Sequence, residues 1–252
     1  MQTFAARVTT SALIAALAAL FCSTADSQDS PVLIRVAEIH VRAGQATDFE
    51  ALAKIVNGAS QKAGIPWRET WSVSVFGEGG VYFLVAPVKN YAQFDEDSPL
   101  ARLPVEERLS YASLGRNAVE SAHYKLLELA SDISLRSDRK EPPKLARVTV
   151  LHTLPGKAPG LEATIKDLLL PALKAAGVKD FWVHRTLAGG PLGEYTYVML
   201  FEKWADLDAL GTLQKILGDN YGKYMARVAE SVAGAENMVI KLDPKLTYFP
   251  EK

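Results

Sequence analysis

The sequence predicts an α+β fold in which two βαββαβ units, placed one after the other in the chain, close their sheets into one barrel. Three observations support this prediction. Identical residues recur 112 positions apart and, after one inserted residue, 113 positions apart. Each half alternates β-prone and amphipathic helical segments in the same order. A sheet with helices on one face leaves its other face bare, and a second copy in the same chain can cover that face.

The internal repeat divides the chain into two copies, residues 32–135 and 145–249, joined by a charged, proline-bearing linker at 136–144. The offset of 112 matches Val36, His40, Gly44, Ala46, Glu50, Ala51 and Lys54 with Val148, His152, Gly156, Ala158, Glu162, Ala163 and Lys166. The offset of 113 matches Ala63, Gly64, Gly80, Tyr82, Val85, Ala92, Asp95 and Tyr111 with Ala176, Gly177, Gly193, Tyr195, Val198, Ala205, Asp208 and Tyr224.

Each copy is expected to contain six elements in the order of a ferredoxin-like unit. In the first copy the expected elements are a strand at 33–41, a helix at 46–62, strands at 67–76 and 81–85, a helix at 104–121 and a strand at 124–130. In the second they are 146–153, 158–175, 180–188, 195–200, 217–233 and 238–242. The helical assignments rest on apolar faces such as Phe49, Leu52, Ala53 and Val56, with Gly64 and Gly177 at the C-terminal cap positions.

The first 25 residues are interpreted as a secretory signal peptide. They carry Arg7 and no acid, and the apolar run SALIAALAALFC is shorter than the ~20 residues that span a bilayer. Small residues at Ser23 and Ala25 suit cleavage before Asp26, which would remove Cys22, the only cysteine. We therefore expect an exported, periplasmic protein with no membrane segment after cleavage.

Composition excludes several classes of partner and cofactor. The net charge is −1 and no long run of like charge occurs, so neither nucleic acid nor an anionic membrane is an expected partner. No HxH or HxxxH pair is present among the four histidines, and we predict no metal site. No GxSxG elbow, phosphate-binding glycine loop or dinucleotide fingerprint is found.

The segments VAEIHVRAGQATDFEALAKIV and FEKWADLDAL resemble the dimeric α+β barrel superfamily, which includes antibiotic-biosynthesis-monooxygenase-like (ABM-like), NIPSNAP-like and EthD-like proteins. The resemblance covers both copies. It implies a barrel that binds a small molecule, and members of the superfamily include cofactor-free oxygenases, haem-degrading enzymes, isomerases and proteins of no known activity. No cofactor is predicted from the residues, and haem enters only by this analogy. The resemblance is compatible with a monomer, in which the two copies pair within one chain, and with a homodimer of such chains.

Strand alternation selects the candidate site residues. Glu38 and His40 share the face that would line the barrel, and they form a candidate catalytic acid–base pair. His152 is the match of His40, but Val150 replaces Glu38. Both histidines could instead hold the turns that follow their strands. The remaining candidate ligand-binding residues are Trp67, Glu69, Trp71, Tyr82, Trp182, His184 and Tyr195. These residues could instead have structural roles, with the tryptophans filling the core and the tyrosine hydroxyls bonded to other protein groups.

Two functions stay open at this point. The first is an oxygenase-like or isomerase-like enzyme acting on an apolar or aromatic compound inside the barrel. The second is a non-catalytic periplasmic binding or structural protein of the same fold. The two differ in whether His40, Glu38 and the tryptophans line an open space or a filled core.

The export interpretation makes one prediction. N-terminal sequencing of the protein recovered from the periplasm should begin near Asp26. A cytoplasmic product that still begins at Met1 would contradict export.

Overall fold

The computed structural model describes residues 31–138 and 142–249, so the expected signal peptide at 1–25 lies outside the described residues. The first half contains the following elements: β1 (Leu33–Val41), α2 (Ala46–Lys62), β2 (Glu69–Val73), β3 (Val81–Val88), the 3-10 helix η1 (Tyr91–Phe94), α3 (Val105–Ala118), β4 (Val119–Leu129) and the 3-10 helix η2 (Ser131–Ile133). Their order is that expected from the sequence. No helix among the described residues is long and apolar enough to cross a bilayer.

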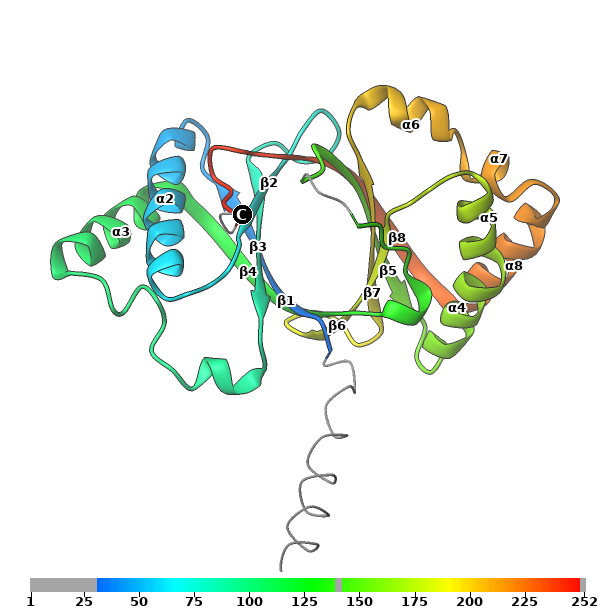
Figure 1. Cartoon of the computed structure of the whole chain (residues 1–252), viewed down its shortest axis with the longest axis horizontal. Coiled ribbons are helices and arrows are strands. Elements are labelled where there is room, and N and C mark those ends of the chain that lie inside the picture. The colour runs from blue at the N-terminus through cyan, green and yellow to red at the C-terminus, as the bar shows by residue number, and fades with distance from the viewer. Residues whose placement is uncertain (1–30, 139–141, 250–252) are drawn as a thin grey trace, which may run out of the picture. The chain divides into compact units, whose positions relative to one another are not determined.

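The second half repeats this order with a more divided helical part. Its elements are β5 (Leu145–Thr153), α4 (Ala158–Thr164), the π-helical turn η3 (Ile165–Leu169), α5 (Leu170–Ala175), β6 (Phe181–Ala188), β7 (Glu194–Phe201), α6 (Trp204–Leu210), α7 (Leu213–Leu217), the 3-10 turn η4 (Gly218–Asn220), α8 (Tyr221–Ser231) and β8 (Val232–Leu242). Figure 1 shows α2 and α3 outside one side of the strands, and the helices of the second half outside the opposite side.

The eight strands form one closed antiparallel barrel in the order β1-β3-β2-β8-β5-β7-β6-β4. Within each half, the first strand is central: β1 pairs with β3 and β4, and β5 pairs with β7 and β8. Two junctions join the halves, β2 with β8 and β4 with β6. Closure leaves none of these eight strands at a sheet edge, which removes the template for edge-to-edge aggregation.

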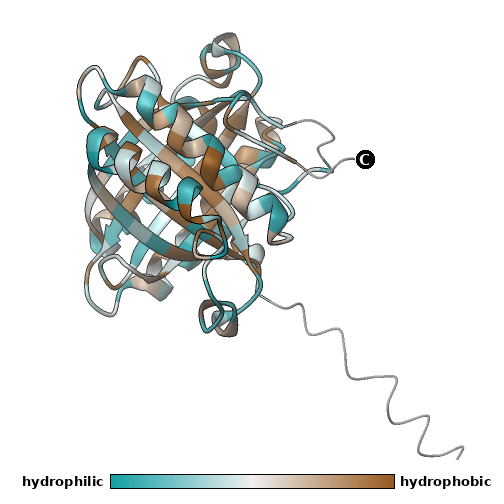
Figure 2. Ribbon diagram, turned by 90° about the vertical axis from the view of Figure 1, so that its left-hand side faces the viewer, coloured by the Kyte–Doolittle hydropathy of each residue, from teal (hydrophilic) through white to brown (hydrophobic). Residues whose placement is uncertain are grey.

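One face of every strand packs on the helices and the other lines the space enclosed by the strands, which we call the lumen. In β1, Ala37 and Ile39 pack with Phe49 and other residues of α2 in a buried cluster on the helix side. Val36, Glu38 and His40 alternate with them and face the lumen. Figure 2 shows hydrophilic and hydrophobic residues interleaved along the strands and helices, as this two-sided packing requires.

The lumen is filled with apolar side chains near one end. Its mouth is the end at which β1 and β5 finish, and its floor is the opposite end. Near the floor, Trp71, Ala146, Leu200, Ile240 and Leu242 are buried together. Other lumen-facing apolar side chains are only partly buried, namely Val36, Phe83, Val85, Val150 and Val198. Part of the lumen wall is therefore accessible to solvent, whereas helix-facing neighbours such as Ala37 and Leu84 are buried.

The stretch in which the offset between matching residues of the two halves changes contains a local change of helix type. Helix α2 is regular over 17 residues. Its counterpart, residues 158–175, contains the π-helical turn η3, which overlaps the stretch from Lys166 to Ala176 where the offset between matching residues changes from 112 to 113. A single inserted residue is commonly absorbed as such a turn. Pro171 follows the turn and has no N–H to donate, which favours the same irregularity.

The largest differences from the sequence-based expectation lie at the last helix and the last strand of each half, and β2 (Glu69–Val73) is shorter than the expected strand at 67–76. Helix α3 ends at Ala118, and β4 begins at Val119 rather than at residue 124. Likewise, β8 begins at Val232 rather than at 238, and the expected helix 217–233 is divided among α7, η4 and α8. The longer last strands pair with the whole of β1 and β5, so sheet pairing overrides local helix propensity at these positions.

A buried ion pair crosses the junction between β4 and β6. Lys125 of the first half donates through Nζ to both carboxylate oxygens of Glu194 in the second half, at 2.8 and 2.9 Å. The Oγ1 of Thr186, on the intervening strand β6, donates to Glu194 Oε1 at 2.7 Å. The Glu194 side chain is 2% exposed and that of Lys125 25% exposed. A carboxylate this deeply buried requires such partners, because removing either charge would leave the other without compensation.

Candidate functional site

His40 lies at the mouth between two carboxylates. Its Nε2 is 2.9 Å from Glu38 Oε1, and its Nδ1 is 3.4 Å from Glu78 Oε1. The hydrogen bond to Glu38 is the main cause that raises the pKa of His40 above its usual value, and burial opposes it. Charge on Glu38 and Glu78 raises this pKa further. The backbone positions of Glu38 and His40 lie about 7 Å apart along the strand, so their side chains must converge to make this contact.

A cleft of about 480 Å³ opens beside His40. The turn after β1 and the hairpin between β2 and β3 form its walls, and Glu78 and Tyr82 contribute side chains to it. The full lining is His40, Val41, Arg42, Ala43, Gly44, Ala46, Glu78, Gly79, Gly80, Tyr82 and Glu120. Glu78 was missed in the sequence because the hairpin tip carries no pattern that predicts where its side chain points.

The second histidine of the repeat has a different environment. His152 Nδ1 is 3.9 Å from Glu194 Oε2, the carboxylate that Lys125 and Thr186 already bind. Glu194 faces His152 across the register of β5 and β7. His152 thus has no acid on its own strand, as expected, but it has one on the neighbouring strand. Sequence alone did not locate that acid, because the register of two strands was needed to bring it there.

Two of the tryptophans line the lower lumen together. Trp71 and Trp182 belong to one cluster of lumen residues. Trp71 donates through Nε1 to Glu69 Oε2 at 2.9 Å, and burial raises the pKa of Glu69. His184 shares the lumen face of β6 with Trp182 and is 5% exposed. Trp67 precedes β2 and lies outside this cluster.

The structure places the two matched tyrosines away from the lumen. Tyr82 and Tyr195 occupy helix-facing positions of β3 and β7, in the two clusters under the helices. The Tyr82 ring packs 4.3 Å from that of Phe49, although Tyr82 also borders the cleft. Tyr195 donates its hydroxyl to Glu162 Oε1 at 2.6 Å, and Arg185 binds the same oxygen at 2.7 Å. Strand alternation is the reason: each tyrosine is one residue out of phase with the lumen face.

All four histidines face the lumen, and none lies on a helix. His123, which sequence reasoning gave no role, is opposite Glu38 in the register of β1 and β4. His40, His123 and His152 belong to the upper lumen, whereas His184 lies lower. No group of three or more metal-ligating side chains occurs among the described residues.

The surroundings of His40 and of His184 do not suit an axial ligand of haem iron. Both ring nitrogens of His40 lie near carboxylate oxygens, which favour the protonated ring, and a protonated ring has no lone pair to give to iron. His184 is neutral, because burial lowers its pKa to about 4, but its Nδ1 is buried within the lower lumen. A macrocycle would need a large apolar slot beside that nitrogen, where the Trp71 and Trp182 cluster packs.

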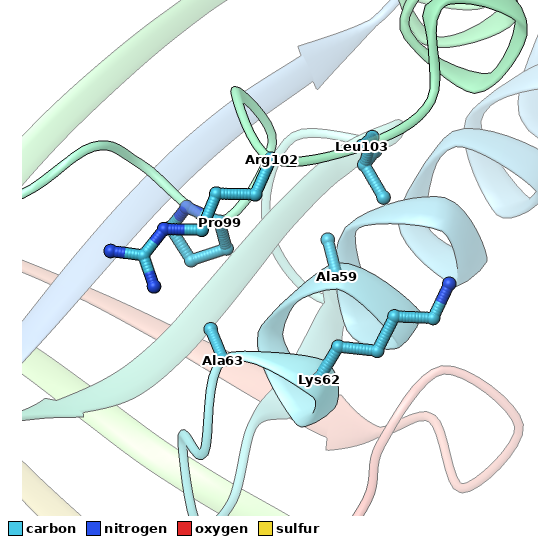
Figure 3. A pocket seen from close by; sticks show the side chains of 6 residues that line it. All are labelled: Ala59, Lys62, Ala63, Pro99, Arg102 and Leu103. Carbon is cyan, nitrogen blue, oxygen red and sulfur yellow. The ribbon is translucent and has the colours of Figure 1, made fainter.

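A second pocket, of about 70 Å³, lies on the outer side of the first half between the end of α2 and the loop before α3. Figure 3 shows its lining, in which the charged ends of Lys62 and Arg102 point away from each other. Arg102 also binds Glu96 at 3.2 Å. The pocket is too small for an aromatic ligand and contains no acid–base pair.

Comparisons with known proteins support the fold. No family model and no curated protein matches the chain. An anthrone oxidase-like protein has a similar solved structure, with a TM-score of 0.63, 14% identity, and coverage of 89% of this chain and 95% of that chain. A candidate monooxygenase from Lactobacillus acidophilus NCFM matches with a TM-score of 0.55 and 7% identity, over 88% and 100% of the two chains.

A heme-binding protein from Thermus thermophilus matches with a TM-score of 0.51 and 12% identity, over 86% of this chain and 93% of that chain. Identities this low show the fold and not the chemistry. The chain therefore shares a mixed α+β fold with solved structures of a candidate monooxygenase, an anthrone oxidase-like protein and a chlorite dismutase, and its eight strands form one antiparallel sheet.

Proposed function

We propose that the protein binds a small aromatic or enolic compound at the mouth of the lumen and transfers a proton to or from it through His40. The single observation that carries this proposal is the His40 imidazole held between Glu38 and Glu78 at the edge of a cleft of about 480 Å³. The likeness to an anthrone oxidase-like protein and to a candidate monooxygenase supports an oxygenase-like reaction class.

The surroundings of His40 suit general acid–base catalysis. Glu38 accepts the proton of Nε2, which in the neutral ring leaves the lone pair on Nδ1, toward the cleft. The raised pKa makes the ring a stronger base than an ordinary histidine. Removing a proton from a phenol, enol or activated C–H leaves an electron-rich anion, which is the species that reacts with dioxygen in a cofactor-free oxygenation. Arg42, in the same cleft, would stabilise that negative charge.

The alternative is a non-catalytic binding or structural protein. It is favoured by the position of His40 and His152, each at the end of a first strand and before a turn with a positive-φ glycine, Gly44 or Gly156. In that case the two histidines would have the same structural role, and neither would affect chemistry.

We further propose that the two halves are tandem copies of one ferredoxin-like unit, that they have diverged in their sites, and that the protein is exported to the periplasm. The shared element order and the π-helical turn at the inserted residue support the duplication. The first copy kept an acid on the strand of its histidine, whereas the second uses the acid of a neighbouring strand.

The duplication predicts the behaviour of one copy by itself. Residues 26–140 expressed alone would expose the lumen face of their sheet, which is apolar toward the floor. We expect a dimer, which would rebuild a barrel, or an insoluble product, and size-exclusion chromatography with light scattering distinguishes these states. A soluble monomer with well-dispersed NMR signals would argue against the proposal.

The catalytic proposal predicts unequal effects of the two histidines. With anthrone as the probe, His40→Ala should reduce the rate of oxygen uptake by about 10²-fold or more, since it removes the base. The matched control His152→Ala should change the rate by less than about tenfold. Because the base must be neutral, the wild-type rate should rise with pH through the raised pKa of His40.

Equal rates in wild type and His40→Ala would overturn the role of His40. If wild type neither consumes oxygen with anthrone nor changes its tryptophan fluorescence with a panel of phenols, the non-catalytic alternative is favoured. The melting temperature of both variants serves as the control for folding, because a purely structural role should lower it in both alike.

A further inference from the structure

Two matched pairs of side chains in the lower lumen differ in how their polar atoms are satisfied. Glu69 and Trp71 on β2 correspond, at the offset of 113, to Trp182 and His184 on β6. The first pair is closed, because Trp71 Nε1 donates to Glu69 Oε2. The second pair is open: Trp182 Nε1 and His184 Nδ1 are both buried, and neither has a hydrogen-bond partner among the described residues.

The open pair offers one donor and one acceptor. An indole N–H only donates. The backbone of Thr196 hydrogen-bonds the His184 ring, and this bond favours the protonated ring, as a carbonyl acceptor does. Because Nδ1 has no hydrogen-bond partner among the described residues, we assign the ring proton to Nε2. Burial keeps the ring neutral at ordinary pH, so Nδ1 carries a lone pair.

The pair lies in the lower lumen, beside partly buried residues of β7. Trp182 and His184 are opposite Val198 and Thr196 in the register of β6 and β7. Both of those β7 residues face the lumen and are only partly buried. Trp182 packs against the cluster that contains Trp71, Leu200 and Ile240, so a ligand would reach the pair only where these side chains give way.

Leaving a buried donor and a buried acceptor unpaired costs free energy, because each group gives up its hydrogen bonds to water and gains none in return. The matched pair on β2 shows that the fold can satisfy such atoms within one strand. On β6 the same positions hold a donor-only ring and an acceptor nitrogen, which are complementary to a hydroxyl group. A hydroxyl accepts one hydrogen bond through its oxygen and donates another through its proton.

We propose that Trp182 and His184 form a hydroxyl-recognition site in the lumen, in which the O–H of a phenol or other aromatic alcohol accepts a hydrogen bond from Trp182 Nε1 and donates one to His184 Nδ1. This inference rests on the proposed function only in that the ligand enters the same lumen, and it does not require chemistry at His40. It narrows the ligand class to aromatic compounds that carry a free hydroxyl.

The test compares phenol with toluene, which has a methyl group in place of the hydroxyl, by NMR of the full mature protein. Four tryptophans give four indole N–H signals in ¹⁵N-labelled protein, and Trp182→Phe assigns one of them. We expect phenol to shift the Trp182 signal and to bind about tenfold or more tightly than toluene. The Trp71 signal, from the closed pair, should move less.

Variants at His184 separate recognition from packing. His184→Phe should remove the preference for phenol, whereas His184→Gln, whose amide oxygen accepts a hydrogen bond, should retain part of it. If His184→Phe does not fold, loss of the preference in Trp182→Phe gives the same information. Equal binding of phenol and toluene would overturn the proposal. It would also be overturned if phenol left the Trp182 signal unmoved while His184→Phe shifted it, because Trp182 Nε1 would then donate to His184 and not to a ligand.

The same experiment in His40→Ala distinguishes this inference from the proposed function. A phenol preference that persists in a variant without oxygen uptake supports both. A persistent preference together with unchanged oxygen uptake removes only the role of His40. Loss of the preference in His40→Ala would contradict a separate hydroxyl site.

Discussion

Closure of the antiparallel sheet is the constraint on which the rest of the structure depends. Because the eight strands form a ring, each strand divides its side chains between the helices and a shared lumen. Two junctions, β2 with β8 and β4 with β6, bring the halves together. The Lys125–Glu194 pair spans the second junction, and it joins a cation from one half to a carboxylate from the other at the mouth. His152 takes its nearest acid from this same pair.

The closed ring also explains why the two halves have different chemistry at matched positions. Strands from both halves contribute to one lumen, so residues at matched positions line the same space from opposite sides. His40 is placed between two exposed or half-exposed carboxylates, while His152 faces a carboxylate that is already neutralised. In the lower lumen, one tryptophan is paired with its own neighbour, and the N–H of the other has no partner among the described residues. The polar groups of the two halves therefore lie at different depths of the lumen: His40 and its carboxylates are at the mouth, and Trp182 and His184 are below them.

Local sequence patterns predicted most of the fold. They predicted only those residues of the candidate site whose position follows from the alternation of side chains along a strand. The period-2 pattern of β1 placed Glu38 and His40 on the lumen face, and the repeat placed His152 there as well. The same rule, applied to Tyr82 and Tyr195, would have assigned them to the helices, where they lie. Glu78, Glu194 and Lys125 required a hairpin conformation or a strand register, which depend on contacts far apart in the sequence. The early starts of β4 and β8 were missed for the same reason, because pairing with β1 and β5 decides them.

A double-mutant cycle on Lys125 and Glu194 tests most directly whether the halves close into one barrel. The two residues are 69 positions apart and meet only if β4 lies beside β6. Unfolding of wild type, Lys125→Met, Glu194→Gln and the double variant should give a coupling free energy of at least about 1 kcal/mol, since breaking a buried pair leaves an uncompensated charge. The exposed pair Arg102–Glu96 provides a control, with an expected coupling below about 0.5 kcal/mol. A coupling between Lys125 and Glu194 that is no larger than this control would contradict the closed barrel and, with it, the shared lumen.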